Sequence, residues 1–512
     1  MRISRAGRLA CVMVVGAVLA AGCSDDSGSD ETEGTGGSGG GSLVLAYPAA
    51  ATVFDPHNPG EVLGSGSRVV IDQVFDTLLK RTVDGGVEPS LAVEMPAAQD
   101  DGSWRFSLRE GVTFSNGEPF NADSVVHSVE RIIDPEFASG LADFFVTLTG
   151  ATKVDEHTVD ITTDGFDSLL PARMTLLFMV PVEGSEASDF AQKPIGTGPY
   201  VLKGTTADGV ELMINPDYWG DEPSISSVKV RFIEDAATSI AALEAGEIDI
   251  MANLPPDLAG TVRNAEARAV AGQESPLIEL NSYAGITADV EVRKALNLAV
   301  DKEALAEQLF SGYAEPAKCQ VVPPSSEGHA DDLEPYAYDP DTARQMLEDA
   351  GVAGDTIQLF SSTVYPNGGQ IAEVIASYWE EVGLSVDLQV LELESYVDQA
   401  VKPTGADAPA ATYVSTSDEL FDATRGLGSV HTTKSTFNRY TNPIVDAAYE
   451  EALTLEPGDE RNDVLHEALQ EACDDAAAVF LLSTQSVWGV ATDVDFSPRP
   501  DGELFVIDVS VG

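Results

Sequence analysis

The segment 371–390 constrains the fold of this chain most strongly, because its hydrophobic period changes from helical to extended. The first part places apolar side chains on one helical face: Ile371, Val374, Ile375 and Tyr378. After Gly383, apolar residues occupy every second position as in a half-buried strand: Leu384, Val386, Leu388 and Val390. A helix joined to a strand by a short turn is expected where helices cover a sheet. We therefore predict a mixed α/β fold.

Other helices are predicted from their ends. Asp339, followed by a proline at the first helical position, begins a helix, and Asp235 precedes an Ala-rich helix that runs through Leu243. The apolar residues of 68–79 recur at mostly helical spacing, which predicts a helix over this whole range. No internal repeat of fixed period accompanies these elements.

Length and charge limit the architecture and the partners. The chain has 512 residues, and a single core stops growing near ~250–300 residues, so two or more lobes are expected. It carries 85 Asp and Glu against 28 Lys and Arg, a formal net charge of -57. Nucleic acid is not an expected partner, because binding its phosphates requires clustered Lys and Arg. The acidic excess itself indicates a solvated surface and identifies no ligand.

The N-terminus has the pattern of an export signal. Three arginines precede the apolar run 9–20, which is shorter than the roughly 20 residues that span a bilayer. Small residues then lead to Cys23, and this junction resembles the bacterial lipobox, which implies cleavage after residue 22 and a diacylated Cys23 on the outer face of the cell membrane. The alternative is an ordinary signal peptide with an incidental cysteine. The Ser-, Gly- and acid-rich range 23–42 is predicted to be a flexible tether.

Two cysteines are left for the folded part of the chain, Cys319 and Cys473, because Cys11 lies in the signal and Cys23 is the lipid site. Outside the cytoplasm such a pair favours a disulfide over two buried thiols. A disulfide would require both residues to belong to the same lobe.

An enzyme is the rival interpretation. The six histidines are scattered, and neither an HExxH nor a CxxC pattern occurs, so no metal centre and no cofactor is expected. The one GxSxG pattern lies in the predicted tether, outside the strand–turn–helix context that a nucleophile elbow requires. A secreted, lipid-anchored hydrolase stays the alternative from another class. A structural or adhesive lipoprotein would predict repeats or long Ser/Thr/Pro stalks, which the sequence lacks.

A series of short motifs resembles the peptide/nickel type of extracellular solute-binding protein, family 5, which serves ABC importers. The motifs run in the family's order from about Leu43 to the C-terminus: Phe54–Pro56, 74–79, Pro89–Ala92, the WRFSLREGVTF of 104–114, 116–125, the GTGPY of 196–200, the NPDYW of 215–219, the VRKALNLAVDK of 292–302 and Asn442–Asp446. Most of these residues are read as turns, caps and packing contacts that identify the scaffold and do not locate the pocket.

The resemblance implies a two-lobed, periplasmic-binding-protein-like fold. The first lobe would comprise residues 43–276, with a subdomain at about 87–191, and the C-terminal return 483–512, while 277–482 would form the second lobe. This placement puts Cys319 and Cys473 in one lobe. A solute would bind between the lobes, whose closure presents a new surface to the membrane permease. The implied protein is a monomeric importer receptor, most simply for short peptides, with oligosaccharides or chelated nickel as the alternative ligands.

The resemblance also gives candidate ligand contacts. Asp418 best matches the family's aspartate that pairs with a peptide α-ammonium, although the tryptophan that usually precedes it is absent here. Tyr413 would supply an aromatic wall. The remaining candidates lie near the predicted crossings between lobes or in the Gly-rich loop after Phe54–Pro56: Asn281, Tyr283, Gln485 and Glu61.

Overall fold

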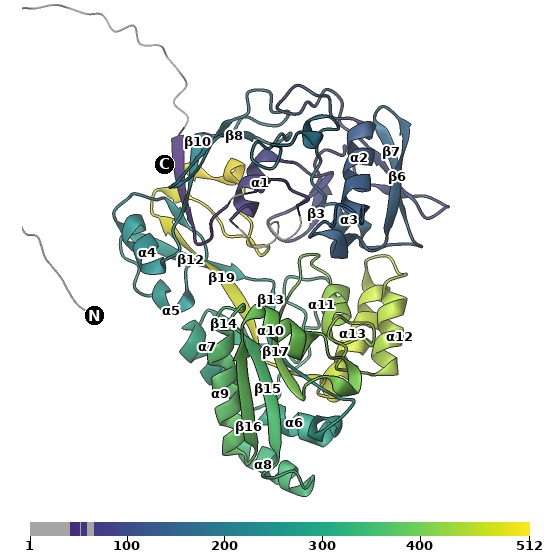
Figure 1. Cartoon of the computed structure of the whole chain (residues 1–512), viewed down its shortest axis with the longest axis vertical. Coiled ribbons are helices and arrows are strands. Elements are labelled where there is room, and N and C mark those ends of the chain that lie inside the picture. Colours follow the sequence, from purple (N-terminus) through teal and green to yellow (C-terminus); the bar gives the residue numbers. More distant parts are fainter. Residues whose placement is uncertain (1–40, 52, 59–65) are drawn as a thin grey trace, which may run out of the picture. The chain divides into compact units, whose positions relative to one another are not determined.

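The computed structural model of the chain describes residues 41–51, 53–58 and 66–512 (Figure 1). The expected signal peptide, the lipid site Cys23, most of the expected tether and the candidate Glu61 lie outside these residues. The first described strand begins at Gly41, so the last two residues of the expected tether, 41 and 42, belong to β1. Among the described helices, none is long and apolar enough to cross a membrane.

An eight-stranded sheet lies at the centre of the first part of the chain. Its path runs β12 (Ala265–Ala271), β19 (Leu482–Ala491), β11 (Ile250–Met251), β1 (Gly41–Tyr47), β10 (Ile225–Phe232), β9 (Gly209–Ile214) and β8 (Tyr200–Thr206), and β14 (Ala314–Pro316) pairs with β19. β1 is parallel to β10 and β11, whereas β19 is antiparallel to both of its neighbours on the path. The C-terminal β19 thus returns to the sheet that β1 began.

A four-stranded antiparallel sheet accompanies this part. Its order is β4 (Ala97–Ala98), β5 (Trp104–Ser107), β7 (Thr158–Thr163) and β6 (Leu148–Asp155), and helix α2 (Ala122–Ile133) packs on β6 and β7. Asn121 caps α2, its side chain accepting a hydrogen bond from the Asp123 N–H at 2.9 Å. The buried residues of α2 and of the four-stranded sheet join those of the eight-stranded sheet in one hydrophobic core.

A five-stranded sheet organises the middle of the chain. Its order is β16 (Ser385–Leu391), β15 (Thr356–Ser362), β17 (Ala411–Ser417), β13 (Glu274–Leu280) and β18 (Ala478–Phe480). Helix α9 (Gly368–Glu381) packs along β15 and β16, as Figure 1 shows. The predicted helix–turn–strand unit is therefore confirmed: β16 follows α9 after a short turn and pairs in parallel with β15.

Apart from the short β14, which pairs with the start of β19, the chain passes twice between the two large sheets. β12 ends at Ala271 and β13 begins at Glu274, and later β18 ends at Phe480 before β19 begins at Leu482. We call the part built around the eight-stranded sheet the first lobe and the part built around the five-stranded sheet the second lobe. The changes of sheet occur at 272–273 and 481, compared with the expected boundaries after 276 and 482.

Cys319 and Cys473 form a disulfide with a Cα–Cα distance of 5.4 Å. Cys473 lies in helix α13 (Asp459–Asp474), and both cysteines are buried in one hydrophobic cluster of the second lobe. The bridge thereby joins the loop after β14 to the last long helix of this lobe.

Helix α1 (Arg68–Val74) is shorter than the expected helix over 68–79. The Val74 carbonyl accepts the Gly198 N–H at 2.9 Å, so it is held by a distant loop instead of by the next helical turn. A Cβ at Gly196 would lie 2.0 Å from the Val74 carbonyl oxygen, which explains why glycine is needed there. The expectation of a longer helix was wrong, and Leu79 begins strand β2 (Leu79–Arg81), paired with β3 (Val87–Pro89).

Two further helices begin where the sequence predicted them. The side chains of Asp235 and Asp339 cap α4 (Ala236–Glu244) and α8 (Pro340–Asp349). The other helices of eight residues or more are α6 (Val290–Leu298), α7 (Lys302–Phe310), α11 (Ala423–Val430) and α12 (Pro443–Ala452).

Candidate functional site

A cavity of about 770 Å³ opens between segments of both lobes. Most of its lining comes from α1, the β2–β3 hairpin, residues 218–222 and the C-terminal segment 499–508 of the first lobe. The second lobe contributes Ser417, Glu419 and Phe421, and Gln273 lies at the first crossing between the sheets. This volume falls within the roughly 300–1,000 Å³ that small-ligand sites occupy.

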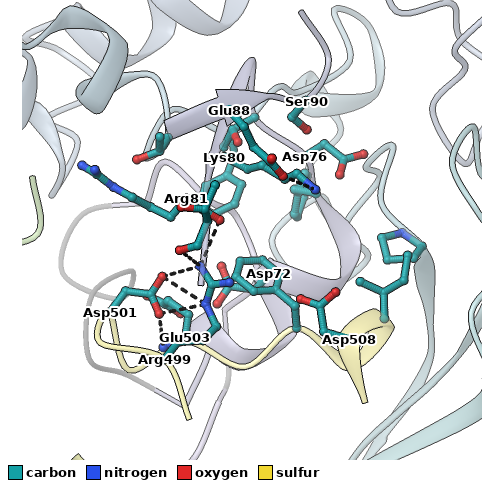
Figure 2. Close-up of a pocket in the computed structure, with 18 of the residues that line it drawn as sticks. Asp72, Asp76, Lys80, Arg81, Glu88, Ser90, Arg499, Asp501, Glu503 and Asp508 are labelled. Atoms are coloured by element: carbon teal, nitrogen blue, oxygen red, sulfur yellow. Dashed lines mark hydrogen bonds and ion pairs between the residues drawn. The ribbon is translucent and has the colours of Figure 1, made fainter. Parts of the chain in front are cut away.

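The lining is rich in charge, and acids outnumber bases. Five lining residues are cationic: Arg68, Lys80, Arg81, Arg109 and Arg499. Nine are carboxylates: Asp72, Asp76, Glu88, Asp221, Glu222, Glu419, Asp501, Glu503 and Asp508. Figure 2 shows Arg499, Asp501 and Glu503 together at one end of the view and the ion pair of Lys80 with Glu88 at the other. Such a lining favours a solute with a net positive charge or with charges of both signs.

Five of these residues form a buried group that we call the Arg68 cluster: Arg68, Asp72, Arg499, Asp501 and Glu503. Arg68 Nε donates to Asp72 Oδ1 at 2.6 Å, and Arg68 Nη2 lies 3.2 Å from Glu503 Oε1. Arg499 Nη2 pairs with Asp501 Oδ2 at 2.7 Å. The α1 helix and the C-terminal segment, more than 400 residues apart in the sequence, thus meet at one end of the cavity.

Trp219 and Asp76 form a polar–aromatic part of the wall. Trp219 Nε1 donates to Asp76 Oδ2 at 2.9 Å, and the Thr197 hydroxyl donates to the same oxygen at 2.9 Å. Burial raises the pKa of Asp76 above its usual range. The Arg109 guanidinium stacks over the Trp219 ring at 4.7 Å. The sequence interpretation had assigned Arg109 and Trp219 to packing; they also line the cavity.

Arg81 links the two lobes beside the cavity. Its Nη2 donates to the Leu420 carbonyl at 2.6 Å, and its guanidinium lies 4.7 Å from the centre of the Phe421 ring. Burial lowers the pKa of Arg81 to about 10, with Asp418 and Asp501 acting in the opposite direction. The side chain therefore remains a cation at neutral pH, and this contact is an interlobe latch formed by Arg81, Leu420 and Phe421.

Asp418 lies between two residues that line the cavity, Ser417 and Glu419, but is itself 3% exposed. Its Oδ2 accepts the Asp422 N–H at 2.8 Å, which orients the start of α11. Burial raises the pKa of Asp418 to about 7. Asp418 itself is therefore not part of the cavity lining.

Three other candidates lie in the scaffold of the second lobe and not in the cavity lining. Tyr413 is 2% exposed in the core, where its ring packs edge-on against Tyr365 at 5.4 Å. The Asn281 amide donates to the carbonyls of residues 405 and 408, at 3.1 and 2.7 Å. The Tyr283 hydroxyl donates to Asn438 Oδ1 at 2.7 Å.

Gln485 also lies outside the lining. It sits on β19 opposite Ala271, and its backbone N–H donates to the Tyr313 carbonyl at 3.0 Å. Sequence reasoning missed Asp72, Arg81 and Glu503. Asp72 and Arg81 flank the motif segment 74–79, and their charge beside an apolar motif is the one signal that could have drawn attention to them.

Two structural details bear on other ligand classes. Within the described residues, no group of three or more His, Cys, Asp or Glu side chains is arranged to hold a metal ion. His57 is fully buried, with Nε2 2.8 Å from the Phe178 carbonyl oxygen, and burial lowers its pKa to about 4. It is a neutral structural histidine at physiological pH.

Residues 86–423 match the family model described as bacterial extracellular solute-binding proteins, family 5, middle. The chain belongs to this family. The family 5 protein described here is 26% identical to heme-binding protein A of Haemophilus influenzae over 85% of this chain and 84% of that protein. It is 28% identical to di/tripeptide-binding protein 1 of Pseudomonas aeruginosa over 70% of this chain and 73% of that protein.

The fold is shared with solved structures of the same kind. The structure of HbpA2 from Haemophilus parasuis superposes with a TM-score of 0.82 at 22% identity, covering 92% of this chain and 100% of that one. This family 5 protein is accordingly a substrate-binding component of an ABC importer, and the relatives it matches are binding proteins.

Proposed function

We propose that this importer component captures short peptides in the cavity between its lobes and presents them to its membrane permease. The cavity itself carries the proposal, because its lining combines segments of both lobes with the crossing residue Gln273. It offers cations and carboxylates, the two kinds of partner that the termini of a peptide require. The similarity to a di/tripeptide-binding protein supports the same ligand class.

Closure of the lobes allows the permease to distinguish the solute-bound protein from the empty one. A solute that contacts both lobes binds the closed arrangement better than the open one, and only this difference in affinity shifts the population. The latch of Arg81 with Leu420 and Phe421 belongs to the closed arrangement, since it joins β2 of the first lobe to the loop after β17 of the second. The closed form then docks on the permease as a monomer.

Asp418 is our candidate for the partner of the peptide α-ammonium. Its carboxyl group lies next to the lining residues Ser417 and Glu419, and its Oδ1 has no hydrogen-bond partner within the described part of the chain. A protonated Asp418 would lose its proton when an ammonium group supplies the counter-charge. Tyr413, Asn281, Tyr283 and Gln485 would act by supporting the walls and the crossing.

We infer that the protein is held at the outer face of the cell membrane by a lipidated Cys23. The support is the junction of small residues before Cys23 after an apolar run of export-signal length. Replacing Cys23 by Ala should move the protein from the membrane fraction to the soluble fraction. Unchanged sedimentation with membranes would contradict the anchor.

The ligand class is tested by two measurements on the purified protein. Native mass spectrometry should detect peptides that co-purify and are released on denaturation. Thermal unfolding with pools of di-, tri- and tetrapeptides should then show stabilisation, about 2.7 kcal/mol for a one-site binder at 100 times its Kd. Stabilisation by oligosaccharides or by chelated nickel alone would replace the peptide proposal. Turnover of a chromogenic substrate, together with no stabilisation by any of the pools, would favour the hydrolase.

A further inference from the structure

The Arg68 cluster carries one more acid than base. Its three carboxylates, Asp72, Asp501 and Glu503, face two guanidiniums, Arg68 and Arg499. All five line the cavity, yet their side chains are only 0–19% exposed. An unbalanced negative charge with so little contact with water is strongly disfavoured. Arg81 acts on Asp501 and Asp508 acts on Arg499, so these neighbours add one charge of each sign and leave the excess unchanged. The cluster therefore requires an additional positive charge or a bound proton.

Unsatisfied atoms show where that charge is needed. Asp72 is 2% exposed, and its Oδ2 accepts no hydrogen bond from an N–H or hydroxyl group of the described residues. Arg68 Nη1 is likewise buried without a partner among those residues, but as a donor it calls for an acceptor atom of the solute and not for its cation. A protonated Glu503 can donate to Asp72, so this carboxylate has that partner only as long as the proton stays. A buried polar group without a partner is rare in folded proteins and marks a position where a ligand atom fits.

The surroundings of Glu503 define its protonation. The groups that face it are Arg68 and Asp72 from α1, Asp501 from its own segment, and Tyr47 from β1. Arg499 also lies within electrostatic range. Burial raises the pKa of Glu503 well above its usual range, with Asp72 and Asp501 acting in the same direction and Arg68 against it.

Apolar surface beside the cluster suits the stem of a long cationic side chain. Phe75, Leu176, Phe178 and Phe505 line the same cavity. The Arg68 guanidinium lies 5.1 Å from the centre of the Phe178 ring. Lysine and arginine side chains bury their methylene stems on such surface while their charged ends reach polar partners.

We propose that the Arg68 cluster is a subsite for an ammonium or guanidinium side chain of the solute, which binds Asp72 and Glu503 and displaces a proton from this pair to solvent. The inference rests on the proposed capture of peptides and narrows their class to peptides with a basic residue. The displaced proton is the only charge that leaves, so the net charge of the cluster is unchanged when the cation enters.

The test uses two matched tripeptides, Ala-Lys-Ala and Ala-Gln-Ala, titrated calorimetrically into the full-length protein between pH 5 and 7. Titration in two buffers of different ionisation enthalpy counts the protons released. The wild type should prefer Ala-Lys-Ala at least tenfold and release up to one more proton with it than with Ala-Gln-Ala, because both peptides carry the α-ammonium that displaces the Asp418 proton. The preference should grow by up to about tenfold per pH unit while Glu503 is protonated. Glu503→Gln should lose the preference and the additional proton, whereas Glu211→Gln on β9, outside the cavity lining, should keep both.

Equal affinity for the two peptides, or a preference that persists in Glu503→Gln, would overturn the subsite. The difference in proton release between the two peptides in the wild type decides the matter even where Glu503→Gln does not fold. If neither tripeptide binds, the peptide proposal fails, and agmatine becomes the probe of the cluster alone. Thermal stabilisation of the wild type by agmatine, absent in Glu503→Gln, then upholds a cation subsite, and no stabilisation of either protein refutes it.

Discussion

Removal of the disulfide is expected to destabilise the second lobe by several kcal/mol without changing the solute site. Cys319 and Cys473 are separated by 154 residues, and the chain between them contains β15, α9, β16 and β17. The loop-closure entropy that a bridge of this span removes from the unfolded chain corresponds to about 5 kcal/mol at 25 °C. The two cysteines are 1% and 8% exposed, so each alanine replacement also removes buried packing.

The assay is urea unfolding of Cys319→Ala/Cys473→Ala beside the wild type, followed by tryptophan fluorescence. Of the four tryptophans, Trp379 is fully buried in the second lobe and reports on its unfolding. We expect a loss of about 2–5 kcal/mol in the free energy of unfolding, the range for native disulfides. Solute affinity should stay within twofold, because neither cysteine lines the cavity. A loss below about 1 kcal/mol would refute the entropic argument for this bridge. A large loss of solute affinity would refute the claim that the disulfide affects only stability and not the solute site.

Three further perturbations test other contacts. Arg81→Lys removes the forked donor that reaches the Leu420 carbonyl, so calorimetric affinity for a bound peptide should fall about tenfold, the equivalent of one charge-assisted hydrogen bond. Gly198→Ala places a Cβ 2.7 Å from the Gln73 carbonyl oxygen and should lower the free energy of unfolding by about 1–3 kcal/mol, whereas Gly204→Ala, with open space around it, should not. Asp418 has its pKa raised to about 7, so it stabilises the fold at low pH and this stability is lost as the pH rises through 7. The free energy of unfolding of the wild type should therefore fall by about 4 kcal/mol relative to that of Asp418→Asn between pH 4 and pH 8. Urea unfolding of both proteins at the two pH values measures this difference.

Local signals predicted the elements whose ends are determined by their own residues. Asp235 and Asp339 cap α4 and α8, and the glycine turn after α9 leads into β16 as the change of period indicated. The end of α1 could not be predicted in this way. It depends on a hydrogen bond from Gly198 to Val74, and no pattern within 68–79 reveals a partner 124 positions away.

The site was less predictable than the fold, because its charges come from distant segments. Glu503 and Asp72 look like ordinary acids in a chain with 85 of them, and only the packing of the C-terminal segment on α1 gives them a common role. Tyr413 shows how burial escapes a sequence-based prediction. It was predicted to form an aromatic wall of the site, and the prediction could not take account of four consecutive buried residues, 411–414, at the start of β17, where its ring packs beside Tyr365.

Asp418 and Glu503 belong to different lobes and share one physical property, a carboxyl group whose pKa is raised by burial. Under our proposals, each carboxyl group gives up its proton to a cationic group of the same solute. A dication such as a lysine-containing peptide satisfies both, whereas a peptide with only an α-ammonium satisfies one and leaves the other carboxyl group protonated. Selectivity for basic peptides should therefore increase with pH. A basic peptide must displace a proton from both Asp418 and Glu503, whereas a peptide with an uncharged side chain must displace one from Asp418 only.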